Sequence, residues 1–253
     1  MTSTFTSSGL ELAYDDIGEK EWGRPVVLLH GYASNRTEGW RRMGWYGAFE
    51  RKRIRVLAVD WRGHGDSAKP HDPQAYTREQ MIGDVFALLD RLGIGRADLF
   101  GYSMGARLAI RAALAQPDRV PDLILGGIGE RLFRPADATG ALAAAMEAEN
   151  PDVISEPLLR SFRAFADEQG EDRLALAACA RGGDYGVTHE LLAGVRARCL
   201  VVAGARDELA GDPQALAASI PGARATALPG CDHFSAIPHA LFKAAVFDFI
   251  DGE

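Results

Sequence analysis

The stretch that decides the fold of this chain is Asp98-Leu-Phe-Gly-Tyr-Ser103-Met-Gly105, in which a serine lies between two glycines in a G-x-S-x-G pattern. A short apolar run leads into Ser103 as a strand, and an alanine- and leucine-rich helix, 104–116, leads out. A serine at such a sharp turn has a strained backbone and an exposed hydroxyl. The helix N-terminus favours negative charge beside that hydroxyl. The alternative for Ser103 is a helix cap in a glycine-rich turn.

Short apolar runs recur along the chain, as in strands buried on both faces of a parallel sheet. They lie at 25–30, 56–60, 97–101, 123–126 and 199–203, with further strands expected at 2–8, 10–17 and 223–228. Helical patterns lie at 77–92, 104–116 and 241–250. Because strands alternate with helices, we predict an α/β fold with a mostly parallel eight-stranded sheet flanked by helices.

One segment, 131–186, interrupts this alternation, because it contains no strand-like run. Its helix-like pieces are 138–148, 156–166 and 172–180. We expect a helical cap that forms a lid over the C-terminal edge of the sheet, inserted into a core made of 1–130 and 187–253. The alternative is a long crossover without a lid role, although a crossover needs only about a dozen residues.

The composition is that of an ordinary globular protein of 253 residues, with 47% hydrophobic and 25% charged residues. The formal net charge of −7 makes nucleic acid and membrane surfaces poor partners. Three widely spaced cysteines suggest neither a disulfide framework nor a zinc site. No signal peptide, membrane span, nucleotide-binding loop or metal-ligand cluster is recognisable. We therefore expect a cytoplasmic protein that uses no cofactor.

A serine hydroxyl needs a base to become a good nucleophile. The candidate bases are His30, His64, His71, His189, His233 and His239. His233 is favoured because it follows the last expected strand in a loop before the final helix, at the sheet edge where Ser103 lies. Cys231 is close to His233 and is a rival nucleophile, but it lacks the turn that Ser103 has.

The candidate acid is Asp207, which follows the apolar run 199–203 after a glycine turn. A buried carboxylate that accepts a hydrogen bond from an imidazole fixes its tautomer and stabilises its charged form. Glu208 and Asp212 are near enough to be rivals, but Asp207 comes first after the strand.

Five pieces in this order carry a family resemblance: Leu29–Tyr32, Asp60–Ser67, Gly101–Gly105, Gly204–Asp207 and Gly230–His233. Over nearly its whole length the chain resembles the α/β-hydrolases, in particular their branch of esterases, lipases and haloperoxidase-like enzymes. The family order of nucleophile, acid and base supports Ser103, Asp207 and His233 as the catalytic residues.

The resemblance also implies an oxyanion hole made by the backbone N–H groups of Tyr32 and Met104. It gives His30 and His64 structural roles. The residues expected to line the substrate pocket are Tyr32, Phe133, Phe162, Phe165 and Phe234.

By resemblance, the chain is a serine hydrolase that cleaves a small carboxylic ester through an acyl-enzyme on Ser103. A thioesterase, a lactonase, a carbon–carbon bond hydrolase, a haloperoxidase and a non-catalytic ligand receptor stay open as alternatives. Epoxide hydrolases and haloalkane dehalogenases of the family carry Asp at the position of Ser103, so both reactions are disfavoured. The expected partner is a small-molecule acyl substrate, and the expected state is a monomer or homodimer.

Overall fold

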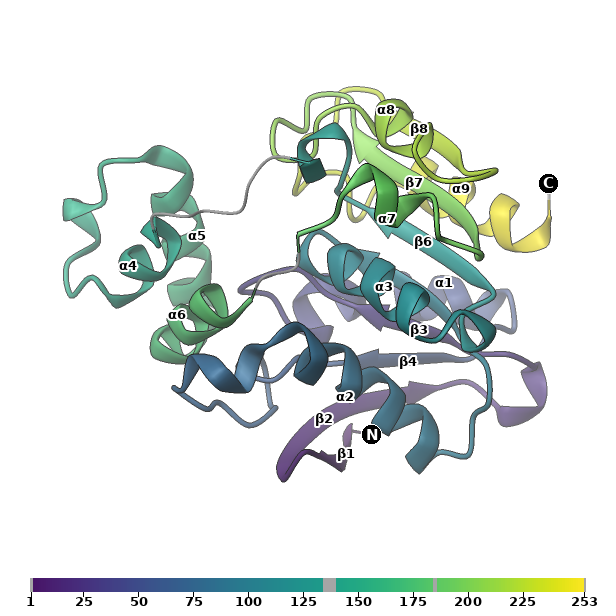
Figure 1. Cartoon of the computed structure of the whole chain (residues 1–253), viewed down its shortest axis with the longest axis horizontal. Coiled ribbons are helices and arrows are strands. Elements are labelled where there is room, and N and C mark those ends of the chain that lie inside the picture. Colours follow the sequence, from purple (N-terminus) through teal and green to yellow (C-terminus); the bar gives the residue numbers. More distant parts are fainter. Residues whose placement is uncertain (1, 134–139, 184–185, 253) are drawn as a thin grey trace.

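The computed structural model describes residues 2–133, 140–183 and 186–252 (Figure 1). Within these ranges eight strands form one sheet in the order β1-β2-β4-β3-β5-β6-β7-β8. The pairs β1–β2 and β2–β4 are antiparallel and the other pairs are parallel. The strands are β1 Thr2–Ser7, β2 Leu10–Ile17, β3 Val26–Leu29, β4 Val56–Val59, β5 Asp98–Tyr102, β6 Asp122–Gly126, β7 Arg198–Gly204 and β8 Arg224–Leu228. The predicted fold class and its mostly parallel eight-stranded sheet are confirmed.

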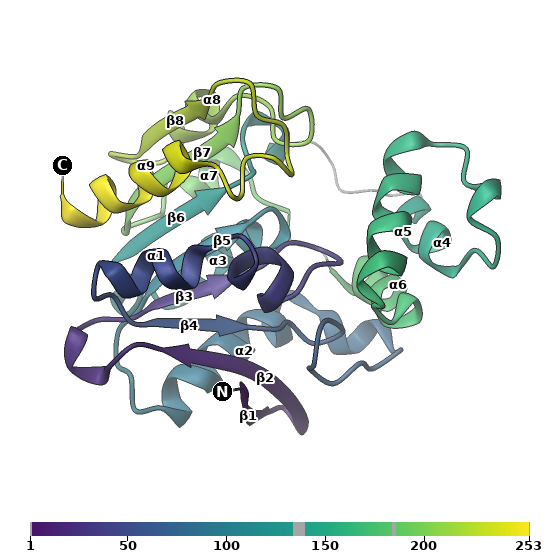
Figure 2. The ribbon, with the colours of Figure 1, turned by 180° about the vertical axis from the view of Figure 1, so that it is seen from behind.

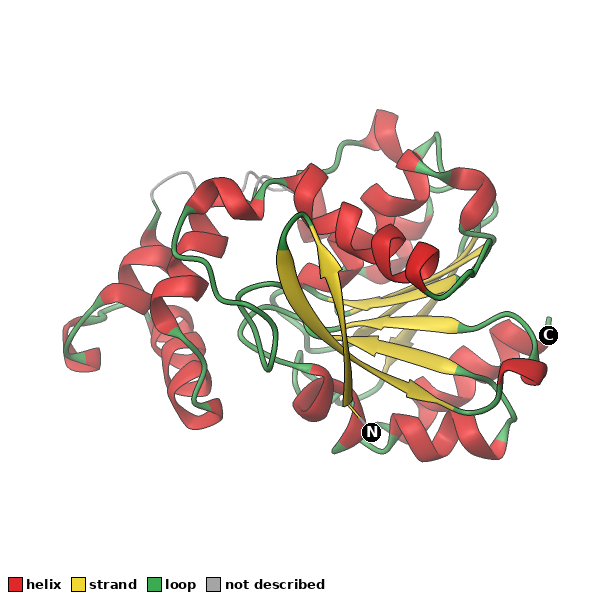
Figure 3. Cartoon of the chain, turned by 90° about the horizontal axis from the view of Figure 1, so that it is seen from below, coloured by secondary structure: helices red, strands yellow, loops and turns green. Residues whose placement is uncertain are grey.

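Helices cover both faces of the sheet (Figure 3). One face carries α2 and α3, and the other carries α1 and α9 (Figures 1 and 2). Two shorter helices, α7 and α8, complete the core. The bounds are α1 Trp45–Arg51, α2 Arg78–Arg91, α3 Met104–Ala115, α7 His189–Leu192, α8 Pro213–Ala217 and α9 Ala240–Asp251.

The continuous apolar runs arise because both sides of each central strand are buried. In β3, Val27 and Leu29 pack with α2 and α3, whereas Val26 and Leu28 pack with α1 and α9. Side chains alternate between the two faces of a strand, so a strand covered on both faces needs apolar residues at every position. Burying each such side chain contributes roughly 1.5–3 kcal/mol.

The insertion folds as three helices that lie together beyond one end of the sheet (Figures 1 and 2). They are α4 Ala141–Glu147, α5 Pro157–Gln169 and α6 Arg173–Gly182, and they match the three helical pieces expected there. Positions 138 and 139 of the first piece lie outside the described residues. The lid role of these helices stays a prediction.

The cap is joined to the core by buried polar contacts. Glu171, between α5 and α6, accepts hydrogen bonds of 2.9 Å from Asn35 Nδ2 and from the N–H of Gly65. The hydroxyl of Tyr32 donates to the carbonyl of Leu176 on α6, at 2.9 Å. These contacts place α6 against the two loops that follow β3 and β4.

The 3-10 helix Glu130–Phe133, at the expected start of the cap, is bonded to the core, because its first two N–H groups donate to the carbonyls of Asp212 and Ala210, both at 3.0 Å. The division into a core and a cap at residue 131 stays a prediction. In the described part of the chain, no helix is long and apolar enough to cross a bilayer.

Candidate active site

Ser103 lies at the turn between β5 and α3, as the sequence predicts. Its backbone has φ 53° and ψ −113°, a conformation that side chains with a Cβ rarely adopt. Such strain costs of the order of 1–3 kcal/mol and persists only when the surroundings impose it. Here the N–H of Ser103 donates to the carbonyl of Gly126 on β6 at 2.8 Å, which fixes the turn against the neighbouring strand.

The two glycines of the motif are required by close backbone contacts. A Cβ on Gly101 would lie 2.3 Å from the carbonyl oxygen of Gly105. A Cβ on Gly105 would lie 2.1 Å from the carbonyl oxygen of Leu29 on β3. Both distances are far below van der Waals contact, so any side chain would push α3 away from the sheet.

His233 and Asp207 are brought together at the same edge of the sheet. His233 Nδ1 donates to Asp207 Oδ2 at 2.8 Å, and the two residues are only 7% and 4% exposed. The other oxygen of Asp207 accepts from the N–H groups of Leu209 (3.0 Å) and Ala210 (2.9 Å). Because a carboxylate only accepts, the hydrogen of the neutral imidazole is on Nδ1, which leaves Nε2 free to act as a base.

The loop that carries His233 is anchored next to Ser103. The hydroxyl of Tyr102 donates a hydrogen bond to the carbonyl oxygen of His233. Burial raises the pKa of Tyr102 well above its usual value, so this hydroxyl remains a donor. Ser103 and His233 also line the same two cavities.

The rival residues lie elsewhere or have other partners. Asp212 caps α8 by accepting from the N–H of Gln214 at 3.0 Å, and Glu208 is exposed. His189 begins α7 and contacts Ser219 Oγ at 2.9 Å. 

Two further rivals have local roles. His239 directly precedes the last helix and caps its N-terminus. Cys231 is a buried thiol 3.6 Å from the carbonyl of Pro229. Within the described residues, no group of three or more His, Cys, Asp or Glu side chains is arranged to hold a metal ion.

The backbone that is expected to form the oxyanion hole is held by His30. Its Nδ1 donates to the carbonyl of Gly31 at 2.8 Å, and its Nε2 accepts from the N–H of Trp61 at 3.1 Å. Burial lowers the pKa of His30 to about 4, so the ring is neutral, as these two bonds require. Because a trans peptide directs its C=O and N–H to opposite sides, this contact turns the N–H of Tyr32 away from His30.

Gly31 brings this peptide against the serine. A Cβ on Gly31 would lie 3.4 Å from the Cβ of Ser103. The N–H of Met104, the first residue of α3, belongs to the helix N-terminus, where N–H groups have no partner within the helix. The peptide before Tyr32 and the first residue of α3 therefore both adjoin Ser103, and the oxyanion hole that they are expected to form stays a prediction.

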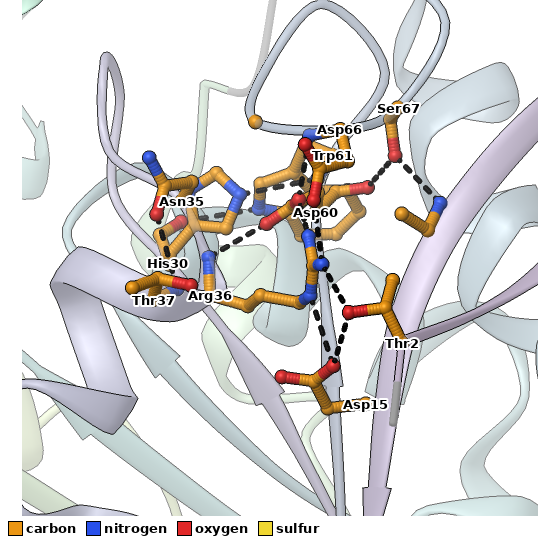
Figure 4. Close-up of polar contacts among 12 residues, drawn as sticks. Thr2, Asp15, His30, Asn35, Arg36, Thr37, Asp60, Trp61, Asp66 and Ser67 are labelled. Carbon is orange, nitrogen blue, oxygen red and sulfur yellow. Dashed lines mark hydrogen bonds and ion pairs between the residues drawn. The ribbon is translucent and has the colours of Figure 1, made fainter.

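A buried ionic network supports the same loop and was not foreseen from the sequence (Figure 4). Arg36 pairs with Asp60, with Asp66 at 2.7 Å and with Asp15 at 3.2 Å. The N–H groups of Arg36 (2.6 Å) and Asp66 (2.8 Å) also donate to the carboxylate of Asp60. A Cβ on Gly65 would overlap this carboxylate at 2.2 Å. The glycine-rich turn after β4 thus closes around an aspartate that fixes the loop after β3.

Two cavities meet at Ser103 and His233. The larger, of about 640 Å³, lies between the core and the cap. The smaller, of about 40 Å³, is lined by apolar side chains that include Trp40 and Ile237. 

The expected pocket residues are divided between these cavities. Tyr32 and Phe162 line both, and Phe165 and Phe234 line the smaller one. Phe133 is not among the described residues that line either cavity, and its ring stacks on that of His189 with 3.6 Å between the centroids.

Comparison with known proteins places this geometry in a family. Residues 26–244 match the family model described as the alpha/beta hydrolase family. The chain belongs to the alpha/beta hydrolase family. This membership confirms the resemblance inferred from the sequence motifs.

Several relatives of this alpha/beta hydrolase have known names. It is 34% identical over 122 residues to epoxide hydrolase 2 of Siraitia grosvenorii, which is 48% of this chain and 37% of that protein. It is 37% identical over 145 residues to the sn-1-specific diacylglycerol lipase ABHD11 of Mus musculus, which is 57% of this chain and 45% of that protein. The chain thus spans less than half the length of these curated relatives.

A solved structure matches almost the whole alpha/beta hydrolase chain. The enol-lactonase from Burkholderia xenovorans LB400 is 28% identical, with a TM-score of 0.82 over 98% of this chain and 100% of that one. Family and relatives together support hydrolase activity.

Proposed function

We propose that this alpha/beta hydrolase cleaves a small carboxylic ester through an acyl-enzyme on Ser103. The observation that carries the proposal is the buried hydrogen bond between His233 and Asp207, beside a strained serine that opens into the same cavities. A nucleophile, a base and an orienting carboxylate are the groups that acyl transfer needs.

In the proposed first half-reaction, Ser103 Oγ attacks the ester carbonyl carbon while its proton passes to Nε2 of His233. The new oxyanion accepts hydrogen bonds from the N–H groups of Tyr32 and Met104. The intermediate then collapses, the carbon–oxygen bond to the alcohol breaks, and His233 returns the proton to the leaving alcohol. Asp207 holds Nδ1 and stabilises the imidazolium that forms between these steps.

In the second half-reaction, water takes the place of the alcohol. His233 accepts a proton from water as the water oxygen attacks the acyl carbon. Collapse of the second intermediate breaks the bond to Ser103 Oγ, which regains a proton from His233. The products are one carboxylic acid and one alcohol, and the protein returns to its starting state.

The two cavities suggest how the two sides of the substrate are divided. The smaller cavity, of about 40 Å³, has far less room than the larger one, so it accepts only a small substituent. The larger cavity, of about 640 Å³, accepts the remainder of a small molecule. We therefore propose an ester with one very small substituent.

A lactone is the second candidate substrate. The similarity to an enol-lactonase over nearly the full length favours it, and a lactone is an internal ester opened by the same steps. A panel of esters, thioesters, lactones and vinylogous diketones separates these reactions from one another, and a single slow turnover distinguishes a ligand receptor. The cytoplasmic location and the monomeric or homodimeric state remain predictions.

The experiment is turnover of p-nitrophenyl acetate and p-nitrophenyl butyrate by purified wild type, Ser103→Ala and Ser155→Ala. Ser155 is an exposed serine and is the matched control. We expect multiple turnovers by wild type and by Ser155→Ala, and loss of activity in Ser103→Ala. Undiminished turnover by Ser103→Ala refutes the assignment. A single slow turnover with retained product favours a receptor.

A further inference from the structure

The larger cavity has a charge opposite to that of the protein as a whole. The described residues that line it include three arginines, Arg107, Arg131 and Arg181, and no aspartate or glutamate. The whole chain carries a formal net charge of −7. A concave site lined by one sign of charge concentrates ligands of the opposite sign, even on a protein of opposite net charge.

Arg107 is the arginine closest in sequence to the nucleophile. It lies one helical turn beyond Ser103 on α3, a rise of about 6 Å. Arg107 and Ser103 line the same cavity, so a group bound by Arg107 lies in the cavity into which Ser103 opens.

Arg107, which is partly buried, also lacks the carboxylate partner that fully buried arginines of this chain have. Arg62 pairs with Asp84 at 2.6 Å, and Arg163 pairs with Asp167 at 2.8 Å. Among the described residues, the polar contact of Arg107 is one weak bond of 3.5 Å to the carbonyl of Leu132. Burial lowers the pKa of Arg107, as expected for a desolvated cation with no carboxylate beside it.

Arg131 provides a second cation from the core. Its backbone N–H donates to the carbonyl of Ala210 at 3.0 Å, which fixes the turn that carries it. No carboxylate in the described ranges forms an ion pair with its side chain. Arg181, which comes from the cap, is already paired with Glu147. The available cations are therefore Arg107 and Arg131.

We propose that Arg107, with Arg131, binds a carboxylate of the substrate in the larger cavity. The natural substrate is then an ester or lactone that carries a carboxylate on the side away from the small apolar cavity. The ester or lactone nature of the substrate rests on the proposed function, whereas the binding of a carboxylate by Arg107 does not. The planar guanidinium forms paired hydrogen bonds with a carboxylate, which makes arginine suited to this recognition.

The kinetic test compares two methyl esters that differ at one end, where one carries a carboxylate and the other a methyl group: monomethyl glutarate and methyl valerate, with hydrolysis followed by titration of the acid released. The measured quantity is the ratio of their kcat/KM values. We expect Arg107→Met to lower this ratio at least tenfold and Arg107→Lys to lower it less, because a charged hydrogen bond contributes about this much. Arg131→Met should lower it severalfold. The control is Arg91→Met, at the exposed end of α2, which should leave the ratio unchanged.

A binding test is independent of catalysis. Glutarate is titrated by calorimetry into Ser103→Ala and into Ser103→Ala combined with Arg107→Met or Arg131→Met, after circular dichroism confirms that each variant is folded. We expect Arg107→Met to weaken glutarate binding at least tenfold. Absence of glutarate binding, or equal binding by all variants, overturns the inference. If neither ester is hydrolysed while glutarate binds through Arg107, the proposed function fails and the carboxylate site stands.

Discussion

The hydroxyl of Tyr102 donates a hydrogen bond to the carbonyl oxygen of His233, so the residue next to Ser103 holds the loop that carries the imidazole. The rings of Tyr102 and His233 lie 5.3 Å apart. Two segments that are distant in sequence are thereby joined beside the proposed reacting groups. The position of His233 depends on Tyr102, the residue that precedes Ser103.

Removing this hydroxyl should impair both catalysis and stability. Tyr102→Phe keeps the ring but leaves the carbonyl of His233 without its donor, a loss of about 1–3 kcal/mol. We expect kcat for p-nitrophenyl acetate to fall roughly tenfold, with a smaller change in KM, because His233 is less well positioned. Steady-state kinetics with thermal melts on the same samples measure this. An unchanged kcat in a folded variant would show that the loop needs no such anchor.

His30 should act on the rate through the Tyr32 peptide, because its ring holds the carbonyl of Gly31. His30→Ala removes the bond to the Gly31 carbonyl that orients the Tyr32 N–H. Loss of one oxyanion donor typically costs about 10²–10³ in kcat, so we expect a fall toward that range with KM little changed. His30→Asn, which can restore a donor near Nδ1, should recover part of the rate. Equal loss in both variants, together with lower melting temperatures, would indicate a purely structural role.

The two buried histidines should make stability depend on pH. Burial lowers the pKa of His30 to about 4 and that of His64 to about 3, both from 6.5. The unfolded chain therefore binds more protons between these values, so the stabilisation is present above pH 6.5 and is lost as the pH falls. Each histidine should contribute up to about 1.4 kcal/mol per pH unit.

The contribution of His64 is measured by difference, because Asp98, with a pKa raised by burial to about 6, acts in the opposite direction in the same window. His64→Asn can keep the donor to the Arg62 carbonyl but does not titrate. Urea unfolding at pH 6.5, 6.0 and 5.5 should show that wild type loses stability faster than this variant. Parallel slopes would mean that His64 is not buried as a neutral ring.

The cap should depend on one buried carboxylate. Glu171→Ala leaves Asn35 Nδ2 and the Gly65 N–H without their acceptor, which costs about 1–3 kcal/mol per unpaired group. We expect faster proteolysis within 140–183 and a higher KM, with the core still folded. The matched control is Glu168→Ala at an exposed position of α5. Identical cleavage of the two variants would show that Glu171 does not hold the cap.

The sequence predicted best those features that come from neighbouring residues. Strand β3 was evident because Val26 to Leu29 are buried on both faces, and the serine turn was evident because Gly101 and Gly105 cannot carry side chains. Helix α1 was not foreseen, since its seven residues are too few to show a helical period.

Features that depend on residues far apart in the sequence were not predicted from it. Arg36 was missed because its partners Asp15, Asp60 and Asp66 come from separate segments, and only the folded chain brings them together. Phe133 was assigned to the pocket on hydrophobicity, which did not predict that its ring stacks on that of His189. The arginines of the larger cavity form no sequence motif, because they also come from separate segments that only the folded chain brings together.

The most direct test of the central claim is labelling with a fluorophosphonate, which reacts with an activated serine, followed by peptide mass mapping. We predict one adduct, on Ser103, that is absent in Ser103→Ala and forms about 10²–10⁴-fold more slowly in His233→Ala, since the base is lost. An adduct on another residue, or no adduct in protein that hydrolyses esters, would contradict the assignment of Ser103 as the nucleophile.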